Sequence, residues 1–339
     1  MKILVTGGAG YIGSHAVTEL LLRNNQVIVF DNLNNSSIKS IERVKKITKK
    51  DFLFIKGDLK NINDLNKLFN SNEIDAVMHF AGLKAVHQSV LNPLEYYSNN
   101  FYGTLNLLKS MKQFNVSNLI FSSSATVYGK YAKTPYQEEM NLGYSSSPYG
   151  SSKIMIEMML EDEAIANKNF KCVSLRYFNP IGAHHSGEIG DNPKGVPNNL
   201  MPFITQVAIG KQKDLIIYGN DYLTADGTCE RDYIHISDLV DGHISALDWL
   251  INNKNFSGVE IFNLGTGNPI SVLEIVKSFE KANEINIPYR FTSRRQGDLP
   301  SFWADTRKAK EILGWECKKS LVDMMKDSWN WQCKNPNGY

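Results

Sequence analysis

The sequence has few cysteines and no arrangement of them that would bind a metal or build a disulfide framework. The four thiols, Cys172, Cys229, Cys317 and Cys333, stand far apart, without a Cys-x-x-Cys pair and without histidines at the spacing of zinc ligands. A small secreted domain that relies on disulfides would have more cysteines at closer spacing. We therefore expect reduced thiols in a cytoplasmic protein, no zinc site, and a core position for Cys172, which lies inside an apolar run.

The chain also lacks a charge excess and a long apolar run. Its net charge of +2 gives no basic field for nucleic acid and no polybasic cluster for a membrane surface. No apolar stretch reaches membrane-spanning length, and Gly7-Gly8 ends the first apolar run before a signal sequence could form. Internal repeats and low-complexity segments are missing too. What remains is a globular chain of 339 residues, enough for one large or two ordinary domains.

A glycine-rich segment follows the first apolar run. Ile3-Leu4-Val5 predicts a short buried parallel strand, and a helix is expected over 14–24. Between them, glycines 7, 10 and 13 form Gly-x-x-Gly-x-x-Gly. Without a Cβ, glycines permit a tight turn and the close approach of a pyrophosphate, to which the helix N-terminus offers unpaired N–H groups. Flanked by a strand and a helix, this pattern predicts a dinucleotide site.

The next two strands end in carboxylates. The strand over 26–30 delivers Asp31 to its C-terminal end, where a carboxylate accepts hydrogen bonds from the adenosine ribose and repels a 2′-phosphate. An aspartate that ends a strand is commonly a helix cap or a turn former. After the glycine loop the ribose role is favoured, so NAD is expected rather than NADP. The strand over 52–56 ends near Asp58, which could meet the adenine amino group.

Small and polar residues follow two later strands, over 76–80 and 119–121. The first opens into Ala81-Gly82-Leu83-Lys84, and small residues suit the crevice at the carboxyl ends of parallel strands. His79 stands among apolar residues and is expected to be buried and hydrogen-bonded rather than a catalytic base. Three serines follow the second strand, and serines there are often turn formers. Ser124 is nevertheless a candidate to hydrogen-bond a phenol and a substrate hydroxyl, because its strand should end on the cofactor side.

That phenol is Tyr149, four residues before Lys153 at the start of a helix-forming run. At i and i+4 the two side chains share one helix face, so the ammonium can approach the ring. Lowering a tyrosine pKa from about 10 to about 7 takes roughly 4 kcal/mol of preferential phenolate stabilisation. The lysine could supply part of this and a bound cationic nicotinamide more. Alone, the pair could be a surface tyrosine beside a solvated lysine, but the rest of the chain favours a catalytic base.

The alternation of strands and helices through residue 178 predicts a doubly wound parallel sheet. We expect an α/β protein with a Rossmann-type NAD-binding domain over 1–179 and a smaller mixed α/β substrate-binding domain over 180–339. The boundary should be interleaved. A strand-like segment over 260–263 lies within the region 236–270, parts of which are expected to pack with the first domain.

Two helical segments, over 99–114 and 154–165, have apolar residues on more than one face. One face must cover the sheet, and the excess suggests a symmetric helix-bundle dimer. The alternative is a deeply buried pair of helices. The apolar residues concerned are Leu105, Leu107, Leu108 and Met111 in the first segment, and Met155, Met158 and Met159 in the second.

Seven segments together resemble the extended short-chain dehydrogenases/reductases, and within them the branch that epimerises UDP-hexoses at C4. The resemblance covers essentially all 339 residues. One modest departure is Phe302, where close relatives often have tyrosine. The segments are TGGAGYIGS at 6–14, FAGLK at 80–84, SSSATVYG at 122–129, SPYG with Lys153 at 147–153, RYFNPIG at 176–182, RDYIH at 231–235 and RQGDLP at 295–300.

The resemblance implies a role for each residue that matches these motifs. The implied catalytic residues are Ser124, Tyr149 and Lys153, and no metal is implied. The implied NAD-binding residues are Gly7, Gly10, Tyr11, Ile12, Gly13, Asp31, Asn32, Leu33, Asn35, Ser36, Asp58, Leu59, Phe80, Ala81, Gly82, Lys84, Asn99, Ser124, Tyr149, Lys153 and Phe178. The implied UDP-sugar-binding residues are Lys84, Ser122, Ser124, Tyr149, Asn179, Asn199, Leu200, Tyr218, Arg231, Tyr233, Arg295, Asp298 and Phe302. Without the resemblance, Arg231 and Arg295 would be ordinary salt-bridge partners rather than forks for a diphosphate.

The implied activity is the reversible epimerisation of UDP-glucose and UDP-galactose, an isomerase step of galactose metabolism with tightly bound NAD. Tyr149, as phenolate, would remove the C4 hydroxyl proton while the C4 hydride passes to the nicotinamide. The 4-keto sugar would then turn over and receive the hydride on its other face. Contacts to the remote UDP group would hold this intermediate in place.

Two alternatives are weighed against this activity. A nucleotide-sugar 4,6-dehydratase or decarboxylase on the same scaffold would need an acid just after Ser124, where the chain has Ala125 and Thr126. A catalytically silent NAD-binding regulator would not need Ser124, Tyr149 and Lys153 together. The expected partners are therefore a UDP-hexose and a second copy of the chain, with no nucleic acid and no membrane.

Phe302 lies, by resemblance, against the far wall of the sugar pocket. Relatives that also accept N-acetylhexosamines have a small residue there, and those confined to glucose and galactose have a bulky aromatic ring. We therefore expect the chain to disfavour N-acetylated UDP-sugars, unless Phe302 is only a core ring beside Trp303.

Overall fold

The computed structural model describes residues 1–195, 197–295 and 297–339 of the chain. They form two compact units, each assembled from separate stretches of sequence. Unit 1 consists of Met1–Tyr131, Glu138–Tyr177 and Val240–Phe262, and unit 2 consists of Ala132–Gln137, Phe178–Leu239 and Asn263–Tyr339.

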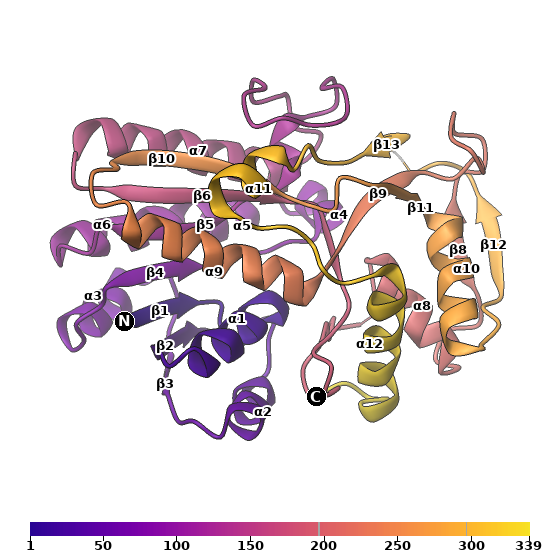
Figure 1. Ribbon diagram of the computed structural model, residues 1–339, viewed down its shortest axis with the longest axis horizontal. Helices are drawn as coiled ribbons and strands as arrows, with labels where there is room; N and C mark the ends of the chain where they lie inside the picture. The colour runs from indigo at the N-terminus through magenta and orange to yellow at the C-terminus, as the bar shows by residue number, and fades with distance from the viewer. Residues whose placement is uncertain (196, 296) are drawn as a thin grey trace. The chain divides into compact units, whose positions relative to one another are not determined.

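Unit 1 is built on a seven-stranded sheet (Figure 1). Its strands are β1 (Lys2–Thr6), β2 (Gln26–Asp31), β3 (Leu53–Lys56), β4 (Ala76–His79), β5 (Asn118–Ser122), β6 (Lys171–Tyr177) and β10 (Gly258–Leu264). They pair in the order β10-β6-β5-β4-β1-β2-β3, and the pairings from β6 to β3 are all parallel. Short continuous apolar runs form such strands because both faces of a parallel sheet are covered.

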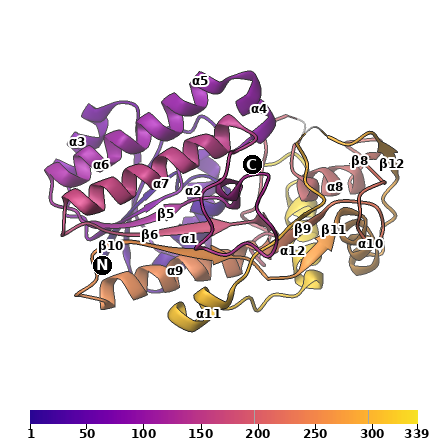
Figure 2. The ribbon, with the colours of Figure 1, turned by 90° about the horizontal axis from the view of Figure 1, so that it is seen from above.

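Helices cover both faces of this sheet (Figures 1 and 2). On one face lie α1 (Tyr11–Leu22), α2 (Ile38–Thr48) and α9 (Ile236–Asn252). On the other lie α3 (Ile62–Asn70), α6 (Gly103–Gln113) and α7 (Pro148–Ala166). The short helices α4 (Val86–Leu91) and α5 (Pro93–Tyr96) and the π-helix η1 (Tyr97–Tyr102) lead into α6, and the 3₁₀-helix η2 (Ala125–Tyr128) follows β5.

The main core of unit 1 lies between the sheet and the helices α3, α6 and α7. Residues that are partners in register across five strands form one buried apolar row there, in the order Ile28, Leu4, Val77, Leu119 and Cys172. Burying an aliphatic side chain of this size stabilises the fold by about 1.5–3 kcal/mol relative to leaving it exposed. Cys172 is fully buried in this row, which confirms the core position expected for it.

Unit 2 contains two smaller sheets and the helices packed on them. In the first sheet, β9 (Glu230–His235) pairs with β7 (Asn179–Ile181), β11 (Pro269–Ser271) and β13 (Ser301–Phe302). The second is a parallel pair, β8 (Leu215–Tyr218) and β12 (Tyr289–Thr292). The helices are α8 (Leu200–Ala208), α10 (Val272–Asn283), α11 (Arg307–Leu313) and α12 (Leu321–Lys334). Ile204, Phe279 and Met325, from α8, α10 and α12, meet in the core of this unit.

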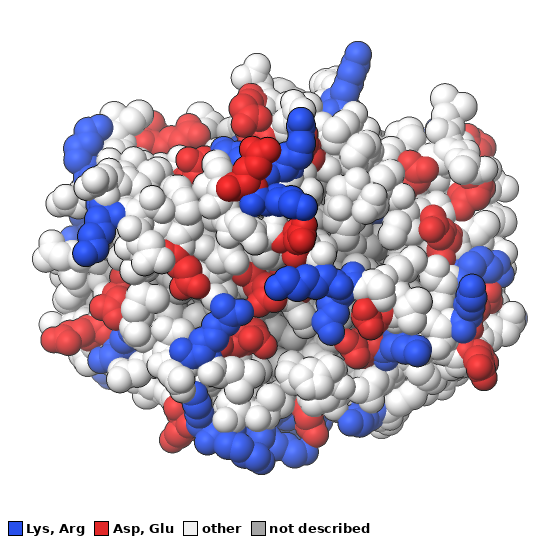
Figure 3. All heavy atoms as spheres, in the orientation of Figure 1, with Lys and Arg blue, Asp and Glu red and all other residues white. Residues whose placement is uncertain are grey.

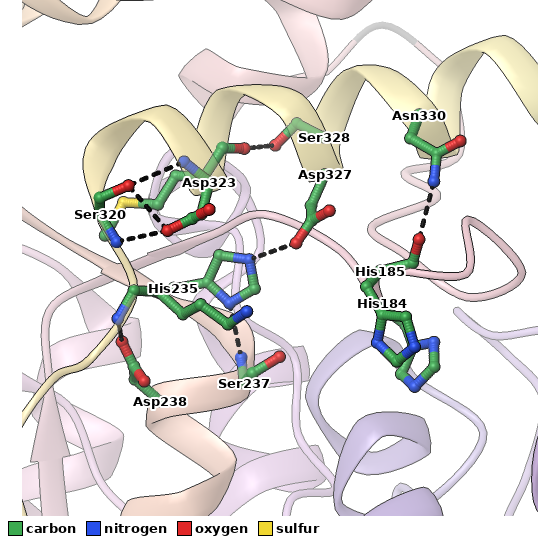
Figure 4. A network of polar contacts seen from close by, with 12 residues as sticks. His184, His185, His235, Ser237, Asp238, Ser320, Asp323, Asp327, Ser328 and Asn330 are labelled. Carbon is green, nitrogen blue, oxygen red and sulfur yellow. Dashed lines mark hydrogen bonds and ion pairs between the residues drawn. The ribbon is translucent and has the colours of Figure 1, made fainter.

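A polar network joins β9 to α12 (Figure 4). His235 Nε2 lies 3.3 Å from Asp327 Oδ2, and His235 Nδ1 accepts a hydrogen bond from the backbone N–H of Ser237 at 3.0 Å. Because Nδ1 accepts, a neutral imidazole carries its proton on Nε2, where it faces the carboxylate. A capping box between Ser320 and Asp323 closes the N-terminus of α12. The network fixes the C-terminal end of β9 against this helix.

The surface drawn in Figure 3 carries lysine and arginine interspersed with aspartate and glutamate, in keeping with the net charge of +2. Among the helices of the described residues, none has both the length and the apolar character that a membrane crossing requires.

The doubly wound fold class is confirmed, and β10, which contains the segment 260–263, lies beside β6 in the main sheet. Two helices differ from the prediction. The helix expected over 14–24 begins at Tyr11, so that Gly13 lies inside it despite the cost of a helical glycine. The helix expected over 99–114 begins as the π-helix η1 and becomes α-helical only from Gly103.

Gly13→Ala is expected to destabilise the protein, because a Cβ there would overlap the carbonyl oxygen of Gly7. Overpacking of a closed site costs about 1–3 kcal/mol or more, which urea denaturation would detect as a lower midpoint. Gly10→Ala is the matched control, since its Cβ would meet only that same oxygen, at 3.2 Å, and should cost less than about 1 kcal/mol. Equal stability of the two variants would contradict the closed packing at Gly13.

Candidate active site

The glycine turn after β1 is shaped by close backbone contacts in unit 1. Gly7 has φ +71°, and a Cβ on it would lie 2.6 Å from the backbone nitrogen of Ala81, so both its conformation and its surroundings require glycine. Gly10 is the N-cap of α1 and donates its N–H to the Gly7 carbonyl at 3.0 Å. A Cβ on Gly10 would meet no other heavy atom within 4 Å, which leaves an open face beside the helix N-terminus. These features fit the pyrophosphate of a dinucleotide.

Asp31 ends β2 with its carboxylate held in place. It accepts hydrogen bonds from the backbone N–H of Ala9 (3.1 Å), the backbone N–H of Leu33 (2.8 Å) and the hydroxyl of Ser36 (2.8 Å). A carboxylate has about four acceptor positions, so room remains for a ribose hydroxyl.

The predicted NAD-binding residues of unit 1 lie along the carboxyl ends of neighbouring strands. Asn32 joins two of these strand ends, because its amide donates to Asp58 Oδ2 at 3.2 Å. Lys84 lies over the ring of Tyr11, with its Nζ 5.5 Å from the centroid. The others are placed as follows: Ile12 in α1, Asn35 in the loop after β2, Leu59 after β3, Phe80 and Gly82 after β4, and Asn99 in η1.

Asn100 is a buried residue beside the predicted Asn99 that sequence reasoning missed. Its side-chain oxygen accepts from the N–H of Leu83 (2.8 Å), and its amide donates to the Leu83 carbonyl (3.0 Å) and to Ser152 Oγ (3.3 Å). Asn100, in η1, therefore connects the loop after β4 to α7 by hydrogen bonds. Two adjacent asparagines were the one signal in the sequence, and nothing local distinguishes Asn100 from its neighbour.

His79 is buried and hydrogen-bonded at both ring nitrogens, as expected. Its Nδ1 lies 2.6 Å from Thr6 Oγ1 and its Nε2 lies 2.8 Å from Thr104 Oγ1. Burial, with the nearby charge of Lys153, lowers the pKa of His79 to about 3. The ring is therefore neutral at ordinary pH and serves as a structural link between β1, β4 and α6.

Tyr149 and Lys153 lie in the first turns of α7, and Ser124 follows β5. Ser147 caps the helix by accepting from the N–H of Gly150 at 3.2 Å. The Ser124 hydroxyl accepts from Thr126 Oγ1 at 3.0 Å, and it lies near enough to the Tyr149 phenol to oppose the rise in its pKa. The structure thus brings together the serine, tyrosine and lysine that were predicted to be catalytic.

The electrostatics of this set differ from the simple expectation that lysine lowers the tyrosine pKa. Burial raises the pKa of Tyr149, and the hydrogen bond from Ser124 offsets this only in part. The Lys153 ammonium donates to the carbonyl of Ser122 at 2.6 Å and lies 6.0 Å from the centre of the Tyr149 ring. Burial also lowers the pKa of Lys153 to about 8. A further positive charge near the phenol is needed to make it a base at neutral pH.

Ser122 was predicted to contact the sugar, and its hydroxyl is bound to other side chains. Its Oγ lies 3.4 Å from His243 Nε2, and the hydroxyl also acts on the buried phenol of Tyr177 by opposing the rise in its pKa. Ser122 is 2% exposed, so its contact with a substrate stays a prediction.

Unit 2 holds the predicted UDP-binding residues. Arg231 forms an ion pair with Asp298 (3.3 Å) and donates to the carbonyl of Leu299 (2.9 Å). The guanidinium of Arg295 lies 4.4 Å from the centre of the Tyr218 ring. The remaining residues lie on or next to elements of this unit: Asn179 on β7 opposite Tyr233 on β9, Asn199 at the N-cap of α8, and Leu200 at the first position of that helix.

Three aromatic rings pack together in unit 2. Phe302 lies 5.1 Å from Tyr136 and 5.1 Å from Phe178, measured between ring centroids. Phe302 is half-buried and is the register partner of Arg231. Tyr136 had not been singled out in the sequence. Of the residues that the structure describes, no three among the histidines, cysteines, aspartates and glutamates are grouped so as to hold a metal ion.

The parallel sheet, the glycine turn and the set of Ser124, Tyr149 and Lys153 define an extended short-chain dehydrogenase/reductase. A family model described as GDP-mannose 4,6 dehydratase matches residues 4–328. A curated UDP-glucose 4-epimerase from Erwinia amylovora is 53% identical over 338 residues, which cover 100% of this chain and 99% of the relative. The chain belongs to the UDP-glucose 4-epimerase family.

Solved structures agree with this assignment. The UDP-glucose 4-epimerase from Bifidobacterium longum, crystallised with NAD⁺ and UDP, has a TM-score of 0.95 and 48% identity, with 100% of both chains covered. The UDP-Glc/GlcNAc 4-epimerase from Campylobacter jejuni has a TM-score of 0.85 and 35% identity, with 98% of this chain and 99% of that chain covered.

The dehydratase alternative is not supported, although the family model carries that description. The two positions after Ser124 cannot supply the required acid, because Ala125 has no acidic group and the Thr126 hydroxyl is bound to Ser124. The full-length relatives at 50–53% identity are epimerases.

Tyr149→Phe is expected to lower the kcat for UDP-galactose at least about a hundredfold, because it removes the proton acceptor without enlarging the site. Binding of NAD and UDP should remain close to that of the wild type. Lys153→Met should be comparably damaging, since it removes the ammonium near the phenol. If Tyr149→Phe kept more than about a tenth of wild-type turnover, another residue would have to be the base.

Proposed function

We propose that the protein interconverts UDP-glucose and UDP-galactose by inversion at C4, with NAD as a resident cofactor. The observation that carries this proposal is the position of Tyr149 and Lys153 one turn apart on α7, with the Lys153 ammonium 6.0 Å from the centre of the Tyr149 ring and Ser124 near the phenol. Membership of the UDP-glucose 4-epimerase family supports the choice of substrate.

The residues of unit 1 fit an NAD molecule. The open face at Gly10 would receive the pyrophosphate, and Asp31 would accept from the ribose hydroxyls. Bound NAD supplies the hydride acceptor and donor that inversion at C4 requires. Tyr149 takes the proton of the C4 hydroxyl and later returns it, while Ser124 orients the phenol and the sugar hydroxyl through its hydrogen bonds. NAD⁺ in the related Bifidobacterium longum structure supports this cofactor.

We assign the UDP part of the substrate to unit 2. Arg231 and Arg295 present planar guanidinium groups that suit a diphosphate, and Asp298 can accept from ribose hydroxyls. Holding UDP by contacts remote from C4 retains the oxidised sugar until the second half of the reaction. In this proposal unit 1 is the NAD-binding domain and unit 2 is the UDP-sugar-binding domain.

We also propose that the protein is a homodimer. Large apolar side chains are exposed on the neighbouring helices α4, α5 and α7 of unit 1: Leu91 is 65% exposed, Leu94 79% and Met158 53%. In contrast, Leu107 and Met111 of α6 are buried in the core. Apolar groups at this exposure favour a second copy of the same surface. Sedimentation equilibrium tests this, and a mass of one chain at micromolar concentration would contradict it.

The cytoplasm is the proposed location. All four cysteines are free thiols, and Cys333 is exposed. An exposed thiol persists in a reducing compartment, whereas an oxidising one would modify it.

Purified protein is expected to release NAD on denaturation and to convert UDP-galactose into UDP-glucose. Enzymatic assay of the released nucleotide tests the cofactor, because the Asp31 carboxylate disfavours a 2′-phosphate. Finding NADP as the main species would contradict the role of Asp31. Finding NAD without any turnover would favour the silent regulator over the epimerase.

Phe302→Cys is expected to raise kcat/KM for UDP-N-acetylglucosamine, which the wild type should convert poorly. An acetamido group needs volume that the phenyl ring occupies, and overlap of about 1–3 kcal/mol corresponds to roughly tenfold to several-hundredfold discrimination. Phe302→Tyr is the matched control, since it keeps the bulk and should not gain the activity. Comparable values for both sugar pairs in the wild type would show that Phe302 is not the gate.

A further inference from the structure

Glu157 is a buried acid one helical turn beyond Lys153 on α7, and the reaction described above does not use it. It is 1% exposed. Its carboxylate accepts hydrogen bonds from four donor groups of unit 1. Oε1 accepts from Ser123 Oγ (2.5 Å), Ser174 Oγ (3.0 Å) and Arg176 Nε (3.1 Å), and Oε2 accepts from the second Arg176 nitrogen, Nη2, at 2.6 Å. Every acceptor position of this carboxylate therefore has a partner.

Arg176 is buried as deeply as its partner. It is 2% exposed, its Nη1 donates to the backbone carbonyl of Glu138 at 3.2 Å, and its guanidinium lies 4.9 Å from the centre of the Tyr128 ring. A buried ion pair of this kind contributes little net stability compared with apolar residues of the same volume. Stability alone therefore does not explain why the Glu157–Arg176 ion pair is buried at this position.

That position is next to the catalytic set. Ser123, which donates to Glu157, directly precedes Ser124 in the chain. Lys153 lies four residues before Glu157 on the same helix, so the two side chains share one face. The Glu157 carboxylate thus binds Ser123, the residue before Ser124, and lies on the same helix face as Lys153.

We propose that Glu157 is a positioning residue of the epimerase reaction, which holds Ser124 at the Tyr149 phenol through Ser123 and places a negative charge beside the Lys153 side chain. This inference rests on the function proposed above. It assigns two separable effects to one carboxylate, an anchoring effect through a hydrogen bond and an electrostatic effect through its charge.

The charged and titratable groups around Lys153 allow the electrostatic effect to be isolated. Tyr149 and Glu157 face it from α7 and neutral His79 faces it from β4, while the backbone carbonyl of Ser122 on β5 accepts a hydrogen bond from its ammonium. Burial lowers the pKa of Lys153 to about 8, and the charge of Glu157 acts in the opposite direction. Without that charge the pKa of Lys153 would be lower. The decrease of kcat on the basic side of the pH profile would then begin at a lower pH.

The test is the pH dependence of kcat for UDP-galactose in four variants. Glu157→Gln should lower kcat about tenfold or more. It should also shift the basic limb of the pH profile of kcat down by about one pH unit. Glu157→Asp should lower kcat but keep the limb in place, because it retains the charge. Ser123→Ala should lower kcat about threefold to tenfold, the value of one hydrogen bond, with an unchanged limb and KM. Asp162→Asn, which removes an exposed charge of the same helix, should behave as the wild type.

Two results would overturn the inference. One is a Glu157→Gln enzyme whose basic limb coincides with that of the wild type, and the other is a Ser123→Ala enzyme with full kcat. Ser123→Ala leaves the charge of Arg176 paired, so full kcat in this variant would overturn the anchoring effect, and with it the inference, even if Glu157→Gln does not fold. A wild type without turnover would instead contradict the proposed function, which separates the two failures.

Discussion

The parallel register of the unit 1 sheet is the constraint on which the rest of the structure depends. Because neighbouring strands run in the same direction, their carboxyl ends lie along one edge. There β1 presents the glycine turn, β2 presents Asp31 and β5 presents Ser124. A slip of one residue in any pairing would turn every side chain of that strand to the other face. The buried row from Ile28 to Cys172 opposes such a slip, so the same contacts maintain the core and align the site.

Burial has opposite consequences for the two central side chains of the site. It favours the neutral form of each, which raises the pKa of Tyr149 and lowers the pKa of Lys153. A hydrogen bond from Ser124 counteracts the first shift and the charge of Glu157 counteracts the second. Because the pKa of Tyr149 stays raised, a cationic ligand beside the phenol would act in the direction that favours the phenolate. Such a balance ties the appearance of the base to the presence of the cofactor.

Local patterns in the sequence predicted the parts of the protein that local physics determines. Short apolar runs predicted the strands of unit 1, and the four-residue spacing placed Tyr149 and Lys153 on one helix face. The roles of Asn100 and Glu157 were not predicted, because their partners are distant in sequence. Leu83 lies 17 residues from Asn100, and Arg176 lies 19 residues from Glu157. A buried glutamate in a helix has the same local pattern as a solvated one. The start of α1 at Tyr11 was missed for a similar reason, since packing against Gly7 overrides the low helix propensity of Gly13.

The division of unit 1 into separate stretches affects how the protein is made. The edge strand β10 (Gly258–Leu264) is synthesised only after the unit 2 stretch Phe178–Leu239. At about 5–20 residues per second, β6 waits on the order of ten seconds for its outer neighbour. An unpaired strand edge invites pairing with other chains during that time. The speed of translation across this stretch therefore influences how much of the nascent chain reaches the native sheet rather than an aggregate.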